Sequence, residues 1–166
     1  MAGQLHQAKM GSEGMYDSLK VVAQTIYGEA RGQGIFDRLL VGAVIRERTL
    51  RPGWWGKDWI TVCKAPWQFS CWNENDVNRS RLETAYSQDY RVFLSCLSIA
   101  DYVIHHMTDR DIREMFGTSG PFPTHYHDRS IWYPETAWGE SRTLVPVGWD
   151  SAFLCYTEIK GNPRRV

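Results

Sequence analysis

A stripe of apolar residues followed at once by glycines constrains how this chain can fold more than any other feature. The stripe has the spacing of a helix that faces a hydrophobic core. Its members are Leu19, Val22, Ala23, Ile26 and Ala30. The sequence therefore predicts a helix over residues 19–30, stopped at Gly32-Gln33-Gly34 by a glycine in the left-handed conformation of a C-terminal cap.

A single carboxylate lies where this helix ends, in the stretch Tyr27-Gly28-Glu29-Ala30-Arg31-Gly32. At about 100° per residue, Glu29 lies about 20° around the helix from Val22, at the edge of the apolar stripe. Partial desolvation disfavours the charged form of a carboxyl, so its pKa is expected to rise. A general acid needs such a pKa near neutral pH. The alternative interpretation is a boundary glutamate that pairs with an arginine such as Arg31.

Apolar periodicity predicts three more helices, near residues 36–48, 90–106 and 111–116. The glycine turn after the first helix is short, so the first two helices are expected to pack as neighbours. Residues 1–15 are rich in Gly, Gln, Ser and Met and are predicted to form a flexible N-terminal arm. Residues 16–166 are then expected to form a single domain.

The rest of the chain shows weaker signals. Residues 54–80 are dense in aromatics and asparagine and predict loops, with at most a short helix near residues 57–64. Gly120-Pro121-Phe122-Pro123 predicts an extended segment. Residues 143–157 predict a strand or hairpin. The expected fold class is α+β, mostly α, in one domain with a small β hairpin.

Composition narrows the classes of partner. The formal net charge is zero, so no basic field favours nucleic acid or a membrane surface. Residues 1–18 lack the apolar core of a secretory signal, and no apolar run approaches the roughly 18 residues of a membrane span. The content of eight Trp and eight Tyr is high. Exposed aromatic faces stack on sugar rings, although large aromatics also fill cores.

The four cysteines are Cys63, Cys71, Cys96 and Cys155. None of them forms a Cys-x-x-Cys pair, which argues against a zinc site or a thioredoxin-type motif. Buried free thiols are the expected state, and the sequence leaves any disulfide pairing open. Neither a metal nor a cofactor is called for by the sequence.

Four short blocks, taken together, resemble the SleB-type cell-wall hydrolase family, first associated with spore-cortex lytic enzymes. They occur in the family's order and extend over most of the chain. Two departures concern Gln33, where a second acid is frequent, and Glu47, where an asparagine is usual. The blocks are Tyr27-Gly28-Glu29-Ala30-Arg31-Gly32, Val41-Gly42-Ala43-Val44-Ile45 with Arg48, Gln68-Phe69-Ser70-Cys71-Trp72, and Thr124-His125-Tyr126-His127.

The resemblance implies a lysozyme-like fold related to lytic transglycosylases. It implies that residues 16–166 are a peptidoglycan-cleaving domain acting between N-acetylmuramic acid and N-acetylglucosamine, by hydrolysis or transglycosylation. By analogy, a short version without a signal peptide resembles a phage endolysin. Such a protein is made in the host cytoplasm, is released through membrane holes made by a separate holin-type protein, and acts on the glycan strands of the wall, here as an expected monomer.

The same resemblance assigns the catalytic role to Glu29. Glu74 and Asp76 are the first candidates for a second acid, with capping of the following turn as the alternative. Only one of the two histidines in the late block is expected to face the cleft. Each substrate candidate has core support as a rival role. The residues expected to bind substrate are Gln68, Phe69, Trp72, His125, Tyr126 and His127.

Two other function classes fit some of the same residues. One is a Cys/His peptidase or amidase of wall peptides, with Cys71 as nucleophile and His125 as base. Its variant is a zinc amidase built from histidines. The other is a non-catalytic glycan-binding module that uses the tryptophans as a platform. The histidines of the zinc variant would be His105, His106, His125 and His127.

Overall fold

The structure is a computed structural model that describes residues 12–53, 55–116, 124–128, 142–145 and 153–158. The described chain is mostly helical, as the sequence predicts, and carries one small antiparallel sheet. The helical elements are α1 (Ser12–Ala30), α2 (Ile35–Leu50), α3 (Trp59–Lys64), a 3-10 turn η1 (Ser70–Trp72), α4 (Arg79–Gln88), α5 (Tyr90–His105) and α6 (Asp109–Phe116). The strands are β1 (His125–Asp128), β2 (Arg142–Val145) and β3 (Phe153–Glu158).

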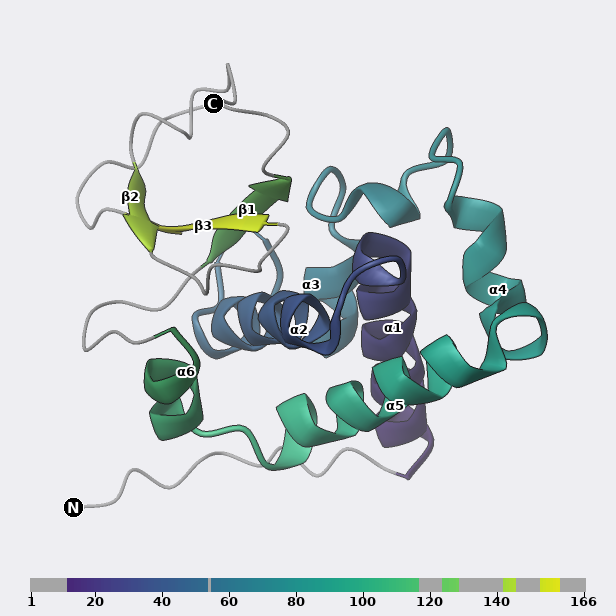
Figure 1. The fold of residues 1–166 in the computed structure, drawn as a ribbon, viewed down its shortest axis with the longest axis horizontal. Coiled ribbons are helices and arrows are strands. Elements are labelled where there is room, and N and C mark those ends of the chain that lie inside the picture. Colours follow the sequence, from purple (N-terminus) through teal and green to yellow (C-terminus); the bar gives the residue numbers. More distant parts are fainter. Residues whose placement is uncertain (1–11, 54, 117–123, 129–141, 146–152, 159–166) are drawn as a thin grey trace.

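Helix α1 is the central element, and α2, α3, α4 and α5 all pack against it (Figure 1). Its predicted stripe is buried: Val22, Ala23 and Ile26 have no exposed surface. Burying a side chain such as Ile26 stabilises the fold by about 1.5–3 kcal/mol. The last turn of α1 is therefore held rigidly against the core.

The predicted N-terminal arm is too long, because α1 already begins at Ser12. Residues 12–15 are helical, and the Ser18 hydroxyl donates to the Gly14 carbonyl at 3.0 Å within the same helix. The sequence suggested a loose segment because residues 1–15 are rich in Gly, Gln, Ser and Met and carry no clear apolar stripe. The stripe fades because this end of the helix meets solvent, with Tyr16 exposed, and not because the helix stops.

The end of α1 at Ala30 was predicted correctly, but the predicted capping mechanism was wrong. Neither Gly32 nor Gly34 has a positive φ. Instead the Arg38 guanidinium, from α2, donates to the Arg31 carbonyl at 2.9 Å and more weakly to the Ala30 carbonyl at 3.4 Å. A cation at a helix C-terminus interacts favourably with the exposed carbonyls.

Helices α2, α5 and α6 confirm the predicted helices to within one or two residues at each end. Helices α2 and α5 approach closely at Gly42, where an added Cβ would lie 2.7 Å from Val103 Cγ2. Helix α4 was missed, because only Leu82 and Ala85 of its residues are buried and its sequence shows little periodicity. The Gln24 amide on α1 donates to the Leu82 carbonyl at 3.0 Å and ties α4 to the core.

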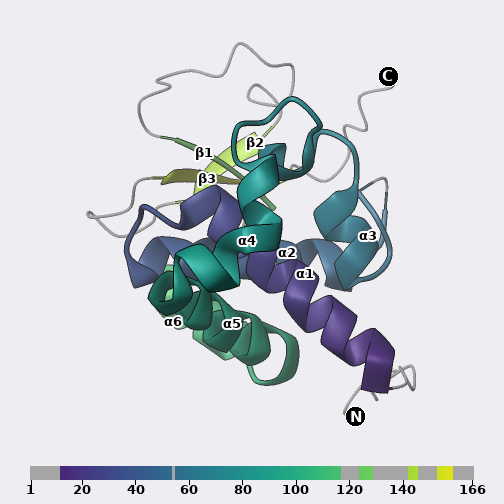
Figure 2. The same ribbon diagram turned by 90° about the vertical axis from the view of Figure 1, so that its right-hand side faces the viewer.

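The sheet has the strand order β1-β3-β2, with both pairs antiparallel. Residue Tyr126 pairs with Cys155 across β1 and β3, and Val145 pairs with Cys155 across β2 and β3. In Figures 1 and 2 the sheet lies on the opposite side of α2 from α5, and β1 contacts α2. The predicted extended segment 120–123 lies outside the described residues.

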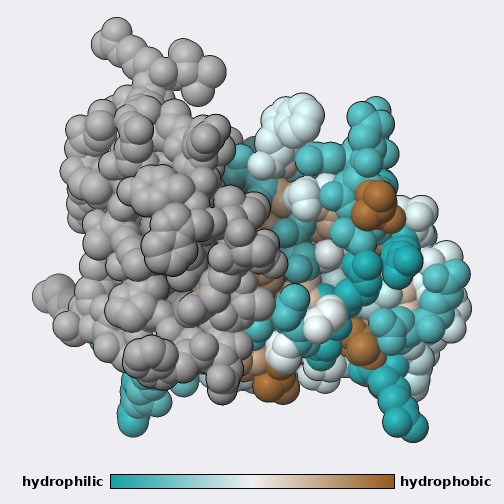
Figure 3. Space-filling model, turned by 45° about the horizontal axis from the view of Figure 1, so that its top comes forward, coloured by the Kyte–Doolittle hydropathy of each residue, from teal (hydrophilic) through white to brown (hydrophobic). Residues whose placement is uncertain are grey.

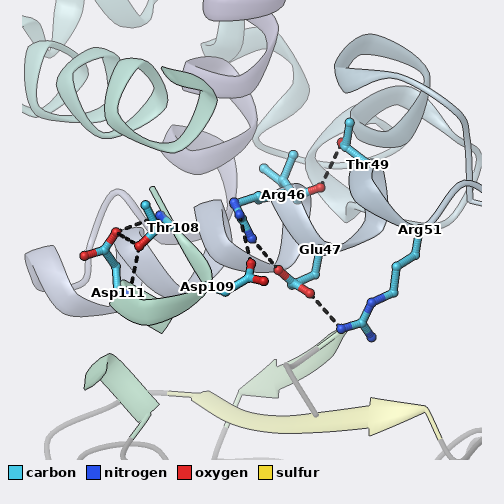
Figure 4. A network of polar contacts seen from close by, with 8 residues as sticks. Arg46, Glu47, Thr49, Arg51, Thr108, Asp109 and Asp111 are labelled. Atoms are coloured by element: carbon cyan, nitrogen blue, oxygen red, sulfur yellow. Dashed lines mark hydrogen bonds and ion pairs between the residues drawn. The ribbon is translucent and has the colours of Figure 1, made fainter. Parts of the chain in front are cut away.

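A network of charged side chains links α2 to α6 (Figure 4). Glu47 is 2% exposed, and its two oxygens accept from Arg46 at 2.7 Å and from Arg51 at 2.8 Å. Arg46 also reaches Asp109 at 3.0 Å. Burial raises the pKa of Glu47, and the two arginines oppose that rise. Glu47 thus has a structural role as the centre of this network.

Candidate functional site

The Glu29 carboxyl lies in the last turn of α1 and is half-buried. Its Oε1 accepts from the backbone N–H of Cys71 at 3.0 Å and from the Ser70 hydroxyl at 3.4 Å. Its Oε2 accepts from the Tyr126 hydroxyl at 2.9 Å. Both oxygens are therefore fixed by groups from elements far away in the sequence, η1 and β1. A carboxyl held in this way has a defined orientation.

Gly28 permits this arrangement. A Cβ at this position would lie 2.5 Å from Cys71 Cβ, 2.7 Å from Cys71 Sγ and 2.9 Å from a Leu82 methyl. Non-bonded atoms do not approach each other this closely, so any side chain at position 28 would force η1 away from α1. The glycine next to Glu29 thus allows the backbone of Cys71 to come within hydrogen-bond distance of the carboxyl.

A second hydrogen bond attaches η1 to α1, at Thr25, one helical turn before Glu29. The Trp72 indole N–H donates to the Thr25 hydroxyl at 2.9 Å, and that hydroxyl donates to the Val21 carbonyl at 2.8 Å. The Trp72 ring is half-buried and has two cations over it, Lys64 at 4.9 Å and Arg79 at 5.0 Å. Trp72 therefore serves first to hold η1 in place.

Tyr126 approaches Glu29 from the sheet. Its ring packs against Phe153, with a centroid separation of 5.0 Å. Burial, together with the neighbouring Glu29 carboxylate, raises the pKa of the Tyr126 hydroxyl well above its ordinary value. The hydroxyl therefore stays protonated at every physiological pH and remains a hydrogen-bond donor to Glu29.

Two of the residues predicted to contact substrate, Phe69 and His125, have buried side chains. Phe69 is 1% exposed and packs beneath the Arg48 guanidinium at 5.0 Å. His125 is 6% exposed, its Nδ1 lies 2.9 Å from the Thr124 hydroxyl, and its ring packs edge-on against Trp55 at 6.1 Å. Both side chains thus pack within the fold and support the loop and strand that carry Ser70, Cys71 and Tyr126.

Strand geometry does not support the expectation that only one of His125 and His127 faces the cleft. Side chains two residues apart on a strand point to the same face, and neighbours point to opposite faces. Tyr126 therefore projects to Glu29 while His125 projects to Trp55. The side chain of His127 lies outside the described residues.

The loop that leads into and out of η1 forms an open pocket of about 570 Å³. Glu74 and Asp76 both line it, as does Trp72. Asp76 accepts from the Asn78 backbone N–H at 2.7 Å, which is the capping role proposed as its alternative. Gln68 is half-buried at the start of the same loop. The other residues that line the pocket are Lys64, Ala65, Pro66, Trp67, Asn73 and Asn75.

Sequence reasoning missed the roles of Thr25, Ser70 and Trp67. Thr25 and Ser70 act through contacts between distant segments, and local spacing carries no signal for such contacts. Trp67 did carry a signal, because it follows Pro66 and precedes the Gln68 block. It is 84% exposed at the rim of the pocket.

The site geometry bears on the two rival enzymes. Burial first, and the Glu29 charge second, raise the pKa of the Cys71 thiol, which disfavours the thiolate that a nucleophile needs. Cys63, Cys71 and Cys96 are free and buried, as expected from the sequence. Within the described ranges, no group of three or more His, Cys, Asp or Glu side chains could hold a metal ion.

Comparison of the chain with models of protein families, with curated proteins and with solved structures finds no match. The resemblance of the four blocks to the SleB-type hydrolases is therefore a hypothesis about function. None of the described helices combines the length and apolar character needed to cross a bilayer.

Proposed function

We propose that the chain cleaves peptidoglycan glycan strands between N-acetylmuramic acid and N-acetylglucosamine, with Glu29 as general acid and base. One observation carries the proposal: the half-buried Glu29 carboxyl is oriented through both oxygens by Tyr126 and Cys71. Three of the four blocks that resemble the hydrolase family supply these groups.

The proposed reaction needs one carboxyl from the protein. Glu29 gives its proton to the glycosidic oxygen as the bond breaks, which leaves an oxocarbenium-like sugar. The muramic 6-hydroxyl or a water molecule then attacks the anomeric carbon of that sugar, and Glu29 takes the proton from the attacking oxygen. The N-acetyl group of the substrate stabilises the intermediate. Tyr126 and the Cys71 amide keep the carboxyl aimed at the bond in both steps.

The proposed second acid has weaker support. Asp76 is engaged with the Asn78 backbone, and Glu74 is exposed at the pocket rim. An inverting or retaining glycosidase places its two carboxyls on either side of the cleaved bond. A mechanism with a single carboxyl is therefore the form that we propose.

The fold and biological setting are also part of the proposal. A mostly helical domain with a small sheet is compatible with a lysozyme-like or lytic-transglycosylase-like arrangement. A phage endolysin that acts on the cell wall as a monomer, after release by a holin-type protein, would fit the resemblance of the four blocks.

Digestion of purified sacculi, followed by mass spectrometry of the soluble fragments, tests the proposal. The wild-type protein is expected to release muropeptides, with anhydro ends if the muramic hydroxyl attacks. Glu29→Gln is expected to release none while keeping its fold, and Cys71→Ala is expected to keep its activity. Cleaved peptide bonds instead of glycan bonds, lost in Cys71→Ala, would support the peptidase. Binding without any fragments would support the glycan-binding module.

A further inference from the structure

We propose that Trp67 is the stacking platform of an additional sugar subsite, which binds an N-acetylated hexose of the glycan strand beyond the bond at Glu29. The subsite is the pocket defined above, and Asn73, Glu74 and Asn75 provide its polar side chains. This inference rests on the proposed function, because it names a second place where the same strand is bound.

The backbone holds Trp67 in an unusual conformation. The Gln68 N–H donates to the Ala65 carbonyl at 3.1 Å, Pro66 follows Ala65, and Trp67 has a φ of 64°. A proline at the second position and a positive φ at the third are the features of a type II β-turn. Glycine is the usual residue at that third position, and a bulky residue there is an outlier. Trp67 is the only non-glycine residue with a positive φ among those the structure describes.

The turn projects the indole into solvent. Trp67 is 84% exposed, whereas Trp55 is buried and Trp59 and Trp72 are half-buried. Trp55 and Trp72 also use their indole N–H groups within the fold. The Trp67 side chain thus contributes little to the core, and its strained turn is explained best by a role at the surface.

The chemistry of the pocket fits a sugar. An exposed aromatic face stacks on the apolar face of a pyranose ring, while planar amide and carboxylate groups bond its hydroxyls. Asn73, Asn75, Glu74 and Asp76 supply those planar groups. Two carboxylates, Glu74 and Asp76, outnumber the one cation of the pocket, Lys64, and this charge balance disfavours a phosphate-bearing ligand. The volume of about 570 Å³ lies within the range of small-molecule sites, about 300–1,000 Å³.

The pocket and the candidate catalytic site share one loop of the chain, residues 64–76. One loop carries Trp67 at the pocket rim and then Ser70 and Cys71, both of which donate to Glu29. Trp72 bonds to α1 and lines the pocket. A strand bound at Glu29 could therefore extend over this loop to Trp67.

A broad protein-binding patch is a poorer explanation of the exposed indole. The pocket beside Trp67 carries the polar side chains of Lys64, Asn73, Glu74, Asn75 and Asp76. The described part of the molecular face drawn in Figure 3 is mainly hydrophilic, with its apolar side chains in separate spots. A stable protein interface requires a larger contiguous surface. A single aromatic ring among polar groups suits a carbohydrate better.

Binding of soluble N-acetylglucosamine tetramer, measured by calorimetry in the inactive Glu29→Gln background, tests the subsite. Trp67→Gly is expected to weaken binding by about tenfold or more. It removes the indole and places the favoured residue in the turn, so its melting temperature should not fall. Trp67→Phe keeps an aromatic face and should retain most of the affinity. Tyr16→Ala, at another exposed aromatic, should bind like the Glu29→Gln parent.

Kinetics on sacculi provide a second readout. Trp67→Gly should raise KM with little change in kcat, because the subsite binds the strand without touching the cleaved bond. Unchanged affinity and unchanged KM in Trp67→Gly would overturn the subsite, even if the wild-type protein cleaves glycan. Binding that depends on Trp67, in a wild-type protein that cleaves nothing, would overturn the proposed enzyme and keep the subsite.

Discussion

The Tyr126 hydroxyl donates a hydrogen bond of 2.9 Å to Glu29 Oε2, although the two residues are 97 positions apart in the chain. This bond joins the sheet to the last turn of α1. The Tyr126 hydroxyl thereby fixes one oxygen of the candidate catalytic carboxyl, while Ser70 and Cys71 of η1 hold the other oxygen.

Tyr126→Phe should lower the lytic rate by about ten- to a hundredfold. A hydrogen bond to a charged group contributes about 1.5–3 kcal/mol, and its loss leaves the Glu29 carboxyl held only from η1. The rate is measured by release of soluble fragments from purified sacculi. Tyr16→Phe is the matched control, because Tyr16 is 68% exposed at the other end of α1. An unchanged lytic rate in Tyr126→Phe would contradict a role of the Tyr126 hydroxyl in the reaction.

The same residue should affect stability at alkaline pH. The pKa of Tyr126 is higher in the folded protein than in the unfolded chain, where it is about 10. Its contribution to the free energy of unfolding is therefore complete below about pH 10 and is lost as the pH rises toward the folded value. Denaturant unfolding between pH 9 and about 11 should show a shallower loss of stability for Tyr126→Phe than for the wild type. Equal slopes would contradict this account.

Gly28→Ala should destabilise the protein by about 1–3 kcal/mol and reduce lysis. The new methyl group would lie 2.5 Å from Cys71 Cβ and would push η1 away from Glu29. Gly32→Ala is the matched control, since nothing lies within 4 Å of a Cβ at that position. Thermal unfolding of the two variants, measured side by side, separates a local clash from a general cost of replacing glycine.

Cys63, Cys71 and Cys96 should resist alkylation in the folded protein. All three thiols are buried, and burial raises the pKa of Cys63 and of Cys96 to about 12. Little thiolate is then present at neutral pH. Iodoacetamide labelling followed by peptide mass spectrometry should modify these residues only after denaturation. Rapid labelling of Cys71 in the native protein would support the alternative that the protein is a Cys/His peptidase.

Glu47→Gln should lower the free energy of unfolding by about 2–4 kcal/mol. Its side chain is 3% exposed between Arg46 and Arg51, and removing its charge leaves the largely buried Arg46 guanidinium paired only with Asp109. Arg51 is 43% exposed, so solvent screens part of this cost and the value falls below that of a fully buried pair. Glu114→Gln breaks an exposed pair with Arg110 and should leave the melting temperature unchanged.

Local sequence patterns determined the helical part of this protein. The apolar stripe over Leu19–Ala30 predicted the buried face of α1, because a helix repeats its contacts every three to four residues. The same reasoning gave α2 and α5 nearly to the residue. It failed at α4, whose few apolar residues leave no period to read. It also failed at the start of α1, where the helix continues into solvent.

The position of Glu29 at a helix end and at the edge of the core was readable from the sequence alone. Only the tertiary structure decided what surrounds it. Spacing along the chain carries no information on which distant groups meet, so neither the Tyr126 bond nor the Cys71 bond could be derived. Burial is likewise set by three-dimensional packing, which is why Phe69 and His125 proved to be supports while Trp67 is exposed at the pocket rim.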